Sequence, residues 1–480
     1  MSNAKQHAAK IVRTLREHGY QAYFAGGCVR DLLLGREPAD FDVATDATPQ
    51  QVMQIFPQTF AVGEQFGVVL VPEHILTGED ARRSIAEKGK GAVVEVTTFR
   101  SDVGYSDGRH PDEVRFSKDP REDVQRRDFT INGMMLDPMM LDSMVFDKTT
   151  NEILDFVGGR EDLKAGIVRA IGEPERRFAE DKLRMLRAVR FAARFDYRID
   201  PATLAAIQKL ATRIHQVSCE RVREELTKML TEGHARRAFE LLDTTGLLPE
   251  VLPEVAAMKG VEQPPEYHPE GDVFVHTLLL LEKLQAGGSV SASVSKTLAW
   301  GALLHDVGKP PTFRRAPDRI RFDGHVEVGV AMGAEICRRF RFSNEETRQV
   351  LALIENHMRF MDAQRMKEST LKRFFRLERF EEHLALHRMD CLAGSGYLEH
   401  WEFVRDRWQA TPEEAVRPQP LITGRELIAA GYAPGARFRE MLQAAEDAQL
   451  EGAVATAEEA LQLVRKRFPL ESGEQRQSNS

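Results

Sequence analysis

The chain has 480 residues, enough for two to four domains and too many for a single core. Hydrophobic residues make up 42% and charged residues 29%, which is typical of a soluble globular protein. No apolar run approaches the ~18 residues that span a bilayer, and the first ten residues lack the apolar stretch of a secretion signal. We therefore expect neither a membrane protein nor a secreted one. The net charge of −8 counts against a nucleic-acid partner, unless positive charge gathers on one surface.

The cysteines indicate a reducing compartment. They are scattered along the chain without the spacing of metal ligands, at Cys28, Cys219, Cys337 and Cys391. We expect reduced thiols in a cytoplasmic protein.

The first ~150 residues mix short strands and helices. Runs rich in β-branched and aromatic residues predict strands within 21–27, 41–45, 67–71 and 92–99. Thr48 and Gln51 can form a capping box around Pro49, which predicts a helix start. The polar stretch 77–91 is predicted to be an exposed loop.

From about residue 150 the pattern is helical almost throughout. An amphipathic helix is predicted over 176–195, and Ser343 and Thr423, each with a glutamate three residues later, are predicted helix starts. The segment 285–296 is rich in Gly and Ser and predicts a flexible connector, and the last residues, 471–480, predict disorder.

Asp40 and Asp42 stand two apart on a predicted strand, so alternation should point both carboxylates to one face. Two adjacent carboxylates suit Mg²⁺, which prefers oxygen ligands. Glu95, in a later predicted strand, is placed to face the same ions. Phosphoryl transfer needs metals that activate an attacking hydroxyl and steady the leaving pyrophosphate. Taken alone, the pair is more simply two solvated acids at a strand end.

The sequence just upstream makes a nucleotide site the better interpretation. Gly26 and Gly27 allow the backbone to approach a triphosphate closely. Arg30, followed by Asp31, offers a fork of donors to phosphate. Glycines, an Arg-Asp pair and two metal-binding acids within 17 residues are much more specific than any of them alone.

The stretch GGCVRDLLLGREPADFDVATDATP, which begins at Gly26, resembles the first motif of the class II tRNA nucleotidyltransferases and of the bacterial poly(A) polymerases. RRDFTINGMMLD, residues 126–137, is similar to their second motif. The resemblance is specific from about residue 20 to 235 and looser to about 465. It implies a polymerase-β-like α/β head followed by an all-α neck, body and tail.

The resemblance also implies roles for the residues in these motifs. Asp40 and Asp42, with Glu95 as a third acid, would hold Mg²⁺, and Gly27 and Arg30 would hold the triphosphate. The residues that would contact the incoming nucleotide are Arg127, Asp128 and Asn132. The alternative for Arg127 and Asp128 is an ordinary surface ion pair.

Asp181 and Arg184 are i,i+3 neighbours on the predicted helix, and Arg187 continues that face. A carboxylate only accepts hydrogen bonds and a guanidinium only donates them. In the family that the motif resembles, such a pair imitates base pairing to CTP and ATP. Asp181 and Arg184 would thus read the base and Arg187 would support the nucleotide. The alternative is a salt bridge on a solvated helix.

The resemblance leaves the substrate range open. The stretch 61–71 lacks the arginine-rich signature of poly(A) polymerases, and 99–116 is similar to the flexible loop of enzymes that add the terminal A. We expect CCA addition to the tRNA 3′ end from CTP and ATP. The alternatives are a poly(A) polymerase or an enzyme that adds only A. The oligomeric state, and whether a partner enzyme shares the synthesis, are left open.

A second constellation lies between about 265 and 395 and resembles the HD phosphohydrolase superfamily. Its residues are His276, His305, Asp306, His325, His357 and Asp390. Neutral imidazoles and carboxylates suit several transition metals, and composition does not choose among them. Any one of these histidines alone is more simply a buried core residue. The set implies a two-metal phosphatase or 2′,3′-cyclic phosphodiesterase.

The domain boundaries follow from these patterns. We expect a nucleotidyltransferase head over 1–150, a helical neck that binds RNA and nucleotide over 151–262, and an HD domain over 263–395. A helical tail over 396–470 would contact tRNA, and 471–480 would be disordered.

Overall fold

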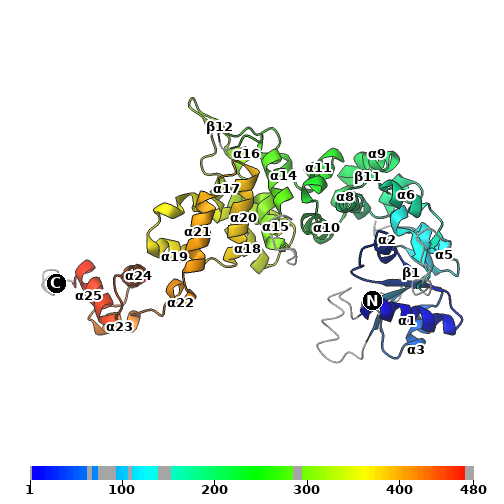
Figure 1. Cartoon of the computed structure of the whole chain (residues 1–480), viewed down its shortest axis with the longest axis horizontal. Coiled ribbons are helices and arrows are strands. Elements are labelled where there is room, and N and C mark those ends of the chain that lie inside the picture. The colour runs from blue at the N-terminus through cyan, green and yellow to red at the C-terminus, as the bar shows by residue number, and fades with distance from the viewer. Residues whose placement is uncertain are drawn as a thin grey trace, which may run out of the picture. The chain divides into compact units, whose positions relative to one another are not determined.

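The computed structural model describes residues 3–61, 67–73, 93–105, 111–138, 153–266, 268–284 and 294–470 (Figure 1). The chain divides into two compact units, Met1–Ala256 and Ala257–Ser480. The predicted loop 77–91 and the predicted disordered end 471–480 lie outside the described residues. Most of the predicted connector 285–296 lies outside them as well.

Unit 1 is built on a mixed sheet whose described strands run in the order β3-β4-β5-β2-β1-β8-β9. The four predicted strand segments are confirmed; burial alternates along β5, whereas β1, β2 and β4 are buried at consecutive positions. Helix α1 packs on this sheet (Figure 1). The strands are β1 (Ala22–Ala25), β2 (Asp42–Thr45), β3 (Phe60–Ala61), β4 (Val68–Pro72), β5 (Val93–Thr98), β8 (Met134–Leu136) and β9 (Ile153–Asp155). Two smaller pairs are β6 (Arg100–Val103) with β7 (Glu113–Phe116), and β10 (Ile167–Val168) with β11 (Arg198–Ile199).

Strands β2 and β5 are parallel neighbours, and their register sets Asp42 beside Glu95. The prediction that Asp40 and Asp42 share a strand is wrong. Asp42 is the first residue of β2, and Asp40 lies in the segment before it. Alternation along a strand therefore does not decide where the Asp40 carboxylate lies.

The helix start predicted at Thr48 is confirmed, with the capping box in place. The described helices of unit 1 are α1 (Asn3–Glu17), α2 (Gly27–Leu33), α3 (Pro49–Ile55), α5 (Pro120–Gln125), α6 (Gly159–Ala165), α7 (Pro174–Glu180), α8 (Leu183–Phe195), α9 (Pro201–Leu210), α10 (Cys219–Thr231), α11 (Ala235–Thr244), α12 (Leu248–Val251) and α13 (Pro253–Ala256), with 3₁₀ turns η2 (Thr130–Asn132) and η4 (Ala211–Gln216).

The single helix predicted over 176–195 is wrong. Two helices, α7 and α8, are separated at Asp181, whose backbone is extended (φ −144°, ψ 107°). The Asp181 carboxylate accepts a hydrogen bond from the Leu183 amide at 3.1 Å. Aspartate competes with helical hydrogen bonding through such local bonds, and periodicity alone does not reveal the break.

Unit 2 is helical apart from one described hairpin, β12 (Arg314–Arg315) with β13 (Ile320–Arg321). The capping boxes at Ser343 and Thr423 are confirmed. The helices are α14 (Val273–Lys283), α15 (Lys296–Leu304), α16 (Lys309–Thr312), α17 (His325–Arg339), α18 (Asn344–Asn356), η5 (His357–Arg365), α19 (Glu368–Phe375), α20 (Phe380–Ala393), α21 (Glu399–Ala410), α22 (Glu413–Val416), α23 (Gly424–Ala429), α24 (Arg437–Leu450) and α25 (Ala457–Arg467).

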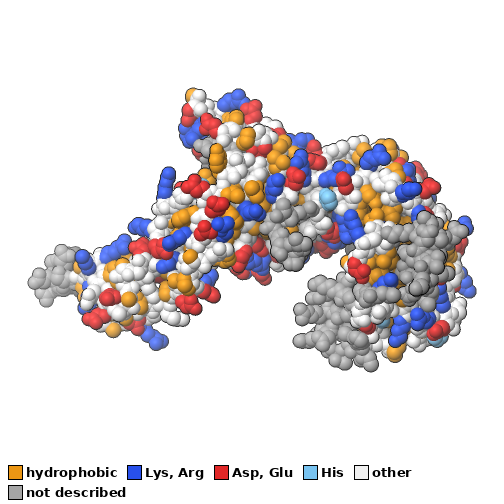
Figure 2. Space-filling model, viewed as in Figure 1, with side chains coloured by type: hydrophobic (Ala, Val, Ile, Leu, Met, Phe, Trp, Pro, Cys, Tyr) orange, Lys and Arg blue, Asp and Glu red, His pale blue; other side chains and the backbone are white. Residues whose placement is uncertain are grey.

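Three further observations bear on the predictions from composition. All four cysteines are free thiols. Within the described residues, no helix has the length and apolar character needed to cross a membrane. Figure 2 shows acidic and basic side chains interspersed over the visible face, so positive charge has to be sought in particular sites.

The packing of α8 on α10 depends on a buried ion pair. Arg190 Nε donates to Glu225 Oε2 at 2.7 Å, and their side chains are 7% and 3% exposed. Removing one partner of such a pair leaves an uncompensated buried charge.

We predict that Glu225→Ala destabilises unit 1 by about 3–5 kcal/mol, measured by urea unfolding followed by circular dichroism. The exposed neighbour Glu224 provides the control, and equal stabilities of the two variants would contradict the prediction.

Candidate functional site

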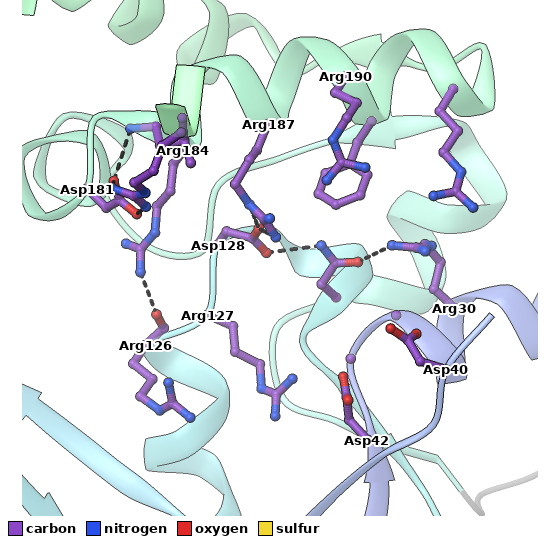
Figure 3. Close-up of a pocket in the computed structure, with 17 residues that line it drawn as sticks. Arg30, Asp40, Asp42, Arg126, Arg127, Asp128, Asp181, Arg184, Arg187 and Arg190 are labelled. Carbon is purple, nitrogen blue, oxygen red and sulfur yellow. Dashed lines mark hydrogen bonds and ion pairs between the residues drawn. The ribbon is translucent and has the colours of Figure 1, made fainter. Parts of the chain in front are cut away.

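A cavity of about 550 Å³ opens in unit 1, between the start of β2 and helix α8 (Figure 3). Its size suits a nucleotide-sized ligand. Eight arginines and four aspartates line it, so its walls carry an excess of positive charge that suits a polyanion. The charged residues are Arg30, Asp40, Asp42, Arg126, Arg127, Asp128, Asp181, Arg184, Arg187, Arg190, Arg194 and Arg221.

Carboxylates gather at one end of the cavity. Asp40 and Asp42 both line it and lie near each other in Figure 3, below the arginines of α8. Burial, the Glu95 carboxylate and Asp40 together raise the pKa of Asp42 to about 7. Asp40 is exposed, and Asp42 and Glu95 are half-buried. Carboxylates that repel one another at such a site suit a divalent cation, whose charge removes the repulsion.

A hydrogen-bond relay crosses the cavity from α8 to α2. Arg187 Nη2 donates to Asp128 Oδ2 at 2.6 Å, and Asn132 Nδ2 donates to Asp128 Oδ1 at 3.0 Å. Asn132 Oδ1 in turn accepts from Arg30 Nη1 at 2.6 Å, and Arg30 Nε donates to Asp31 at 2.9 Å. The relay therefore joins three predicted nucleotide-binding motifs.

The relay also fixes the charge state of its central carboxylate. Burial alone would raise the pKa of Asp128, but Arg187 and the Asn132 amide lower it well below the ordinary value. Asp128 is therefore ionised. The alternative that Asp128 and Arg127 form a surface ion pair is wrong, because Asp128 is buried and its partner is Arg187.

Arg127 is held toward the cavity by a residue that the sequence analysis missed. Its Nη2 and Nε donate to Asp123 Oδ2 at 2.9 and 3.2 Å, and Asp123 also accepts from Arg126. The signal was present in the spacing, because Asp123 in α5 stands i,i+3 and i,i+4 from these arginines. Gly26 has φ +75°, which strains any other residue, and a Cβ there would lie 2.8 Å from Arg127 Nη1, so the guanidinium would have to shift.

Asp181 and Arg184 both line the cavity, but they do not form the i,i+3 ion pair that was the alternative to base reading. Asp181 binds Arg221, with Nη2 donating to Oδ2 at 2.7 Å. Arg184 donates to Glu180 Oε2 at 2.9 Å and to the Arg126 carbonyl at 2.9 Å. Sequence reasoning missed Arg221 because it comes from α10, far along the chain.

Unit 2 brings the six predicted metal ligands together. Among the residues that the structure describes, three groups have ligand atoms within 4.8 Å of one another: His276, His305 and Asp390; Asp306, His325 and His357; and His268, Glu270 and His276. His305 follows the last residue of α15, as expected for the His-Asp pair. Sequence reasoning missed His268 and Glu270, which lie in the turn before α14.

Three of these imidazoles are oriented as metal ligands. The Nδ1 atoms of His305, His325 and His357 donate to the carbonyls of Ala302, Phe322 and Ile354 at 2.9, 3.0 and 2.7 Å. That leaves each Nε2 with a lone pair, and each is buried without a hydrogen bond. Burial lowers the pKa of His357 to about 4, so its ring is neutral. A buried nitrogen without a hydrogen bond costs free energy of folding unless a metal ion binds it.

Asp306 lies between the two main groups. Its Oδ2 is 3.1 Å from His305 Nε2, and its Oδ1 is 3.7 Å from His357 Nε2 and 3.9 Å from His325 Nε2. One carboxylate thus faces both sets of imidazoles, which fits a pair of divalent cations that share it. Lys309 Nζ donates to the same carboxylate at 2.7 Å and balances part of its charge.

Three known domain families match the chain. Residues 22–169 match the "Poly A polymerase head domain", 196–259 the "Probable RNA and SrmB- binding site of polymerase A", and 273–393 the "HD domain". The residues that line the cavity of unit 1 lie in the first match, in the segment between the first two matches and, for Arg221, in the second. The six predicted metal ligands of unit 2 lie within the third match, and His268 and Glu270 lie just before it.

Curated relatives and solved structures agree with these matches. The chain is 42% identical over 242 residues to the CCA-adding enzyme of Geobacillus stearothermophilus, which covers 50% of this chain and 53% of that protein. The match to the enzyme of Geobacillus sp. WCH70 is 40% over 247 residues, so the chain aligns with only about half the length of these relatives.

The crystal structure of the Bacillus stearothermophilus CCA-adding enzyme with CTP is similar over 97% of this chain and 98% of that one, with a TM-score of 0.71 and 28% identity. The Thermotoga maritima CCA-adding enzyme complexed with tRNA has the same fold, with a TM-score of 0.55 over 96% and 94% of the chains at 18% identity. An α/β head followed by helical parts with an HD domain is thus confirmed.

The raised pKa of Asp42 gives a pH-dependent prediction. A cation needs the ionised carboxylate, so below about pH 7 binding must first displace a proton. We predict that Mg²⁺ binds this site about tenfold more weakly at about pH 6 than at about pH 8. Calorimetry in buffers of different ionisation enthalpy should show uptake of Mg²⁺ releasing close to one proton at the lower pH. Affinity that is the same at both values would contradict the assignment.

Proposed function

We propose that this chain, which belongs to the nucleotidyltransferase family that CCA-adding enzymes and bacterial poly(A) polymerases share, adds CCA to the 3′ end of tRNA from CTP and ATP. The observation that carries the proposal is the cavity of unit 1, with Asp40 and Asp42 at one end and a bank of arginines facing them. The relatives named as CCA-adding enzymes, and the similar structure with CTP, support it.

The residues at the carboxylate end would hold Mg²⁺. Asp40 and Asp42, with Glu95 in register on the neighbouring strand, offer oxygen ligands of the kind that this ion prefers. When bound there, Mg²⁺ lowers the pKa of the RNA 3′-hydroxyl and neutralises charge that builds up on the phosphates. In the reaction, a bond forms between the 3′-oxygen and the α-phosphorus, and the bond from that phosphorus to pyrophosphate breaks.

The other residues bind and orient the triphosphate. At the N-terminus of α2 the Gly27 backbone amide would face the triphosphate, whereas the Gly26 amide donates to the Met134 carbonyl at 3.2 Å. The Arg127 guanidinium lies beside Gly26. Arg30 and Arg187 are fixed by the relay through Asp128 and contribute positive charge without being free to move. Preorganised charge of this kind stabilises a transition state at little reorganisation cost.

Base selection is assigned to Asp181 and Arg184, with Arg187 as support. The Asp181 carboxylate is fixed by Arg221 and by the Leu183 amide, and the Arg184 guanidinium by Glu180 and a carbonyl. Both groups are therefore presented in defined orientations at the cavity wall. An acceptor and a donor in fixed positions can discriminate base edges by hydrogen bonding.

The transfer assignment is tested with the double variant Asp40→Ala/Asp42→Ala. It should lose incorporation of CMP and AMP into tRNA to background, because no ligands remain for the ions, while tRNA binding survives. Glu37→Ala, an exposed acid in the same segment, is the control. Incorporation that persists in the double variant would refute the metal assignment.

The substrate range is tested with tRNAs that end before the CCA sequence, after its first C, and after both C residues, each with CTP, ATP or both. Stepwise completion that stops at CCA is expected. Use of ATP alone, only on tRNA that already ends in CC, would favour an enzyme that adds only A. Long A tails on unstructured RNA without use of CTP would favour a poly(A) polymerase.

For unit 2 we propose a second activity, hydrolysis of a phosphomonoester or of a 2′,3′-cyclic phosphate at an RNA end. The residues that would hold a transition metal are His276, His305, Asp306, His325, His357 and Asp390. A metal bound there would supply a nucleophilic hydroxide at neutral pH. The orphaned Nε2 atoms are the observation that favours it.

Phosphate release should be chelator-sensitive, persist in Asp40→Ala/Asp42→Ala, and vanish in His305→Ala, which removes one buried ligand. The assay is release of phosphate, or opening of a 2′,3′-cyclic phosphate, by purified protein reloaded with Mn²⁺, Ni²⁺ or Co²⁺. Release that His305→Ala leaves intact would show that the activity comes from elsewhere.

A further inference from the structure

The turn before α14 carries a carboxylate that is not among the six predicted metal ligands, Glu270. Glu270 Oε1 lies 2.6 Å from His276 Nδ1 and 2.9 Å from His268 Nδ1. Its side chain is 7% exposed, and its Oε2 is buried without a hydrogen bond. A buried carboxylate in which one oxygen binds two imidazoles is too costly to be incidental.

The opposite nitrogen of His276 faces the metal cluster. His276 Nε2 lies 3.0 Å from Asp390 Oδ1, and the His276 ring is within 5.5 Å of the His305 ring, centre to centre. His276 is fully buried, so it has no water to satisfy either nitrogen. Its two nitrogens therefore have separate tasks, one toward Glu270 and one toward the cluster.

We propose that Glu270 is a positioning residue for the metal centre of unit 2, which accepts the Nδ1 hydrogen of His276 and so presents Nε2 as the metal ligand. The proposal rests on the proposed metal site. A carboxylate behind a ligating imidazole fixes its tautomer, holds its ring plane and makes it a better donor. The other histidines of the cluster use backbone carbonyls for the same purpose, so His276 is the one ligand among them that has a charged acceptor.

The local backbone holds Glu270 in place. Gly271 has φ +131°, a region that favours glycine. The Asp272 side chain that follows accepts from the Val275 amide at 2.8 Å and the Gly260 amide at 2.7 Å. The turn is thus anchored to α14 on one side and to the preceding segment on the other. His268, perpendicular to His276 with ring centres 4.8 Å apart, holds the same oxygen from a second direction.

The proposal is tested by metal affinity, with Co²⁺ as the probe, because its visible absorption reports on its ligands. All proteins carry Asp40→Ala/Asp42→Ala, so that unit 1 contributes no carboxylate site. Glu270→Ala should raise the dissociation constant for Co²⁺ by about 10–100-fold. Glu270→Gln should raise it less, because an amide oxygen still accepts the Nδ1 hydrogen. The exposed acid Glu266, replaced by Ala, is the matched control and should leave the constant unchanged.

The outcomes separate the two proposals. A parent protein that binds no Co²⁺ in unit 2 would overturn the metal centre and the role of Glu270 with it. A parent that binds Co²⁺, with Glu270→Ala equally tight and with the same absorption spectrum, would overturn the role of Glu270 alone. If circular dichroism shows that Glu270→Ala does not fold, Glu270→Gln decides: a weakening of about threefold or more supports the proposal, and unchanged affinity overturns it.

Discussion

The arrangement of unit 1 depends on the buried Asp128 carboxylate. It receives Arg187 from α8 and Asn132 from its own turn, and Asn132 passes the connection to Arg30 on α2. These residues come from segments that are far apart in the sequence, so one anion aligns the helices on both sides of the cavity. Leaving one buried charge unpaired costs more free energy than the intact pair contributes. The relay should therefore form as a whole.

Much of the fold could be predicted because its signals are local. The strands around Val43 and Val96 follow from runs of β-branched residues, and the helix starts at Thr48, Ser343 and Thr423 follow from capping boxes. The break at Asp181 could not be predicted, because the amphipathic pattern continues across it. The Asp181 carboxylate there also binds Arg221, and no pattern within α7 and α8 encodes a partner from α10.

The sequence predicted most residues of both candidate sites but not the positions of all their side chains. The residue types and spacing around Asp40 pointed to a metal, but not to the position of its carboxylate, since Asp40 lies before the strand. In unit 2 the six ligands were named from the sequence, whereas the direction in which each ring points depends on carbonyls at Ala302, Phe322 and Ile354. Glu270 was missed because an acid in a turn before a helix has no distinguishing pattern.

The glycine at position 26 ties together two motifs that lie a hundred residues apart. Its missing Cβ is the space in which the Arg127 guanidinium rests, since an added carbon would come within 2.8 Å of Nη1. A side chain at position 26 would push that guanidinium away from its place at the cavity wall, in addition to the strain that φ +75° imposes on any residue but glycine. A change at one end of the first motif would thus be felt in the second.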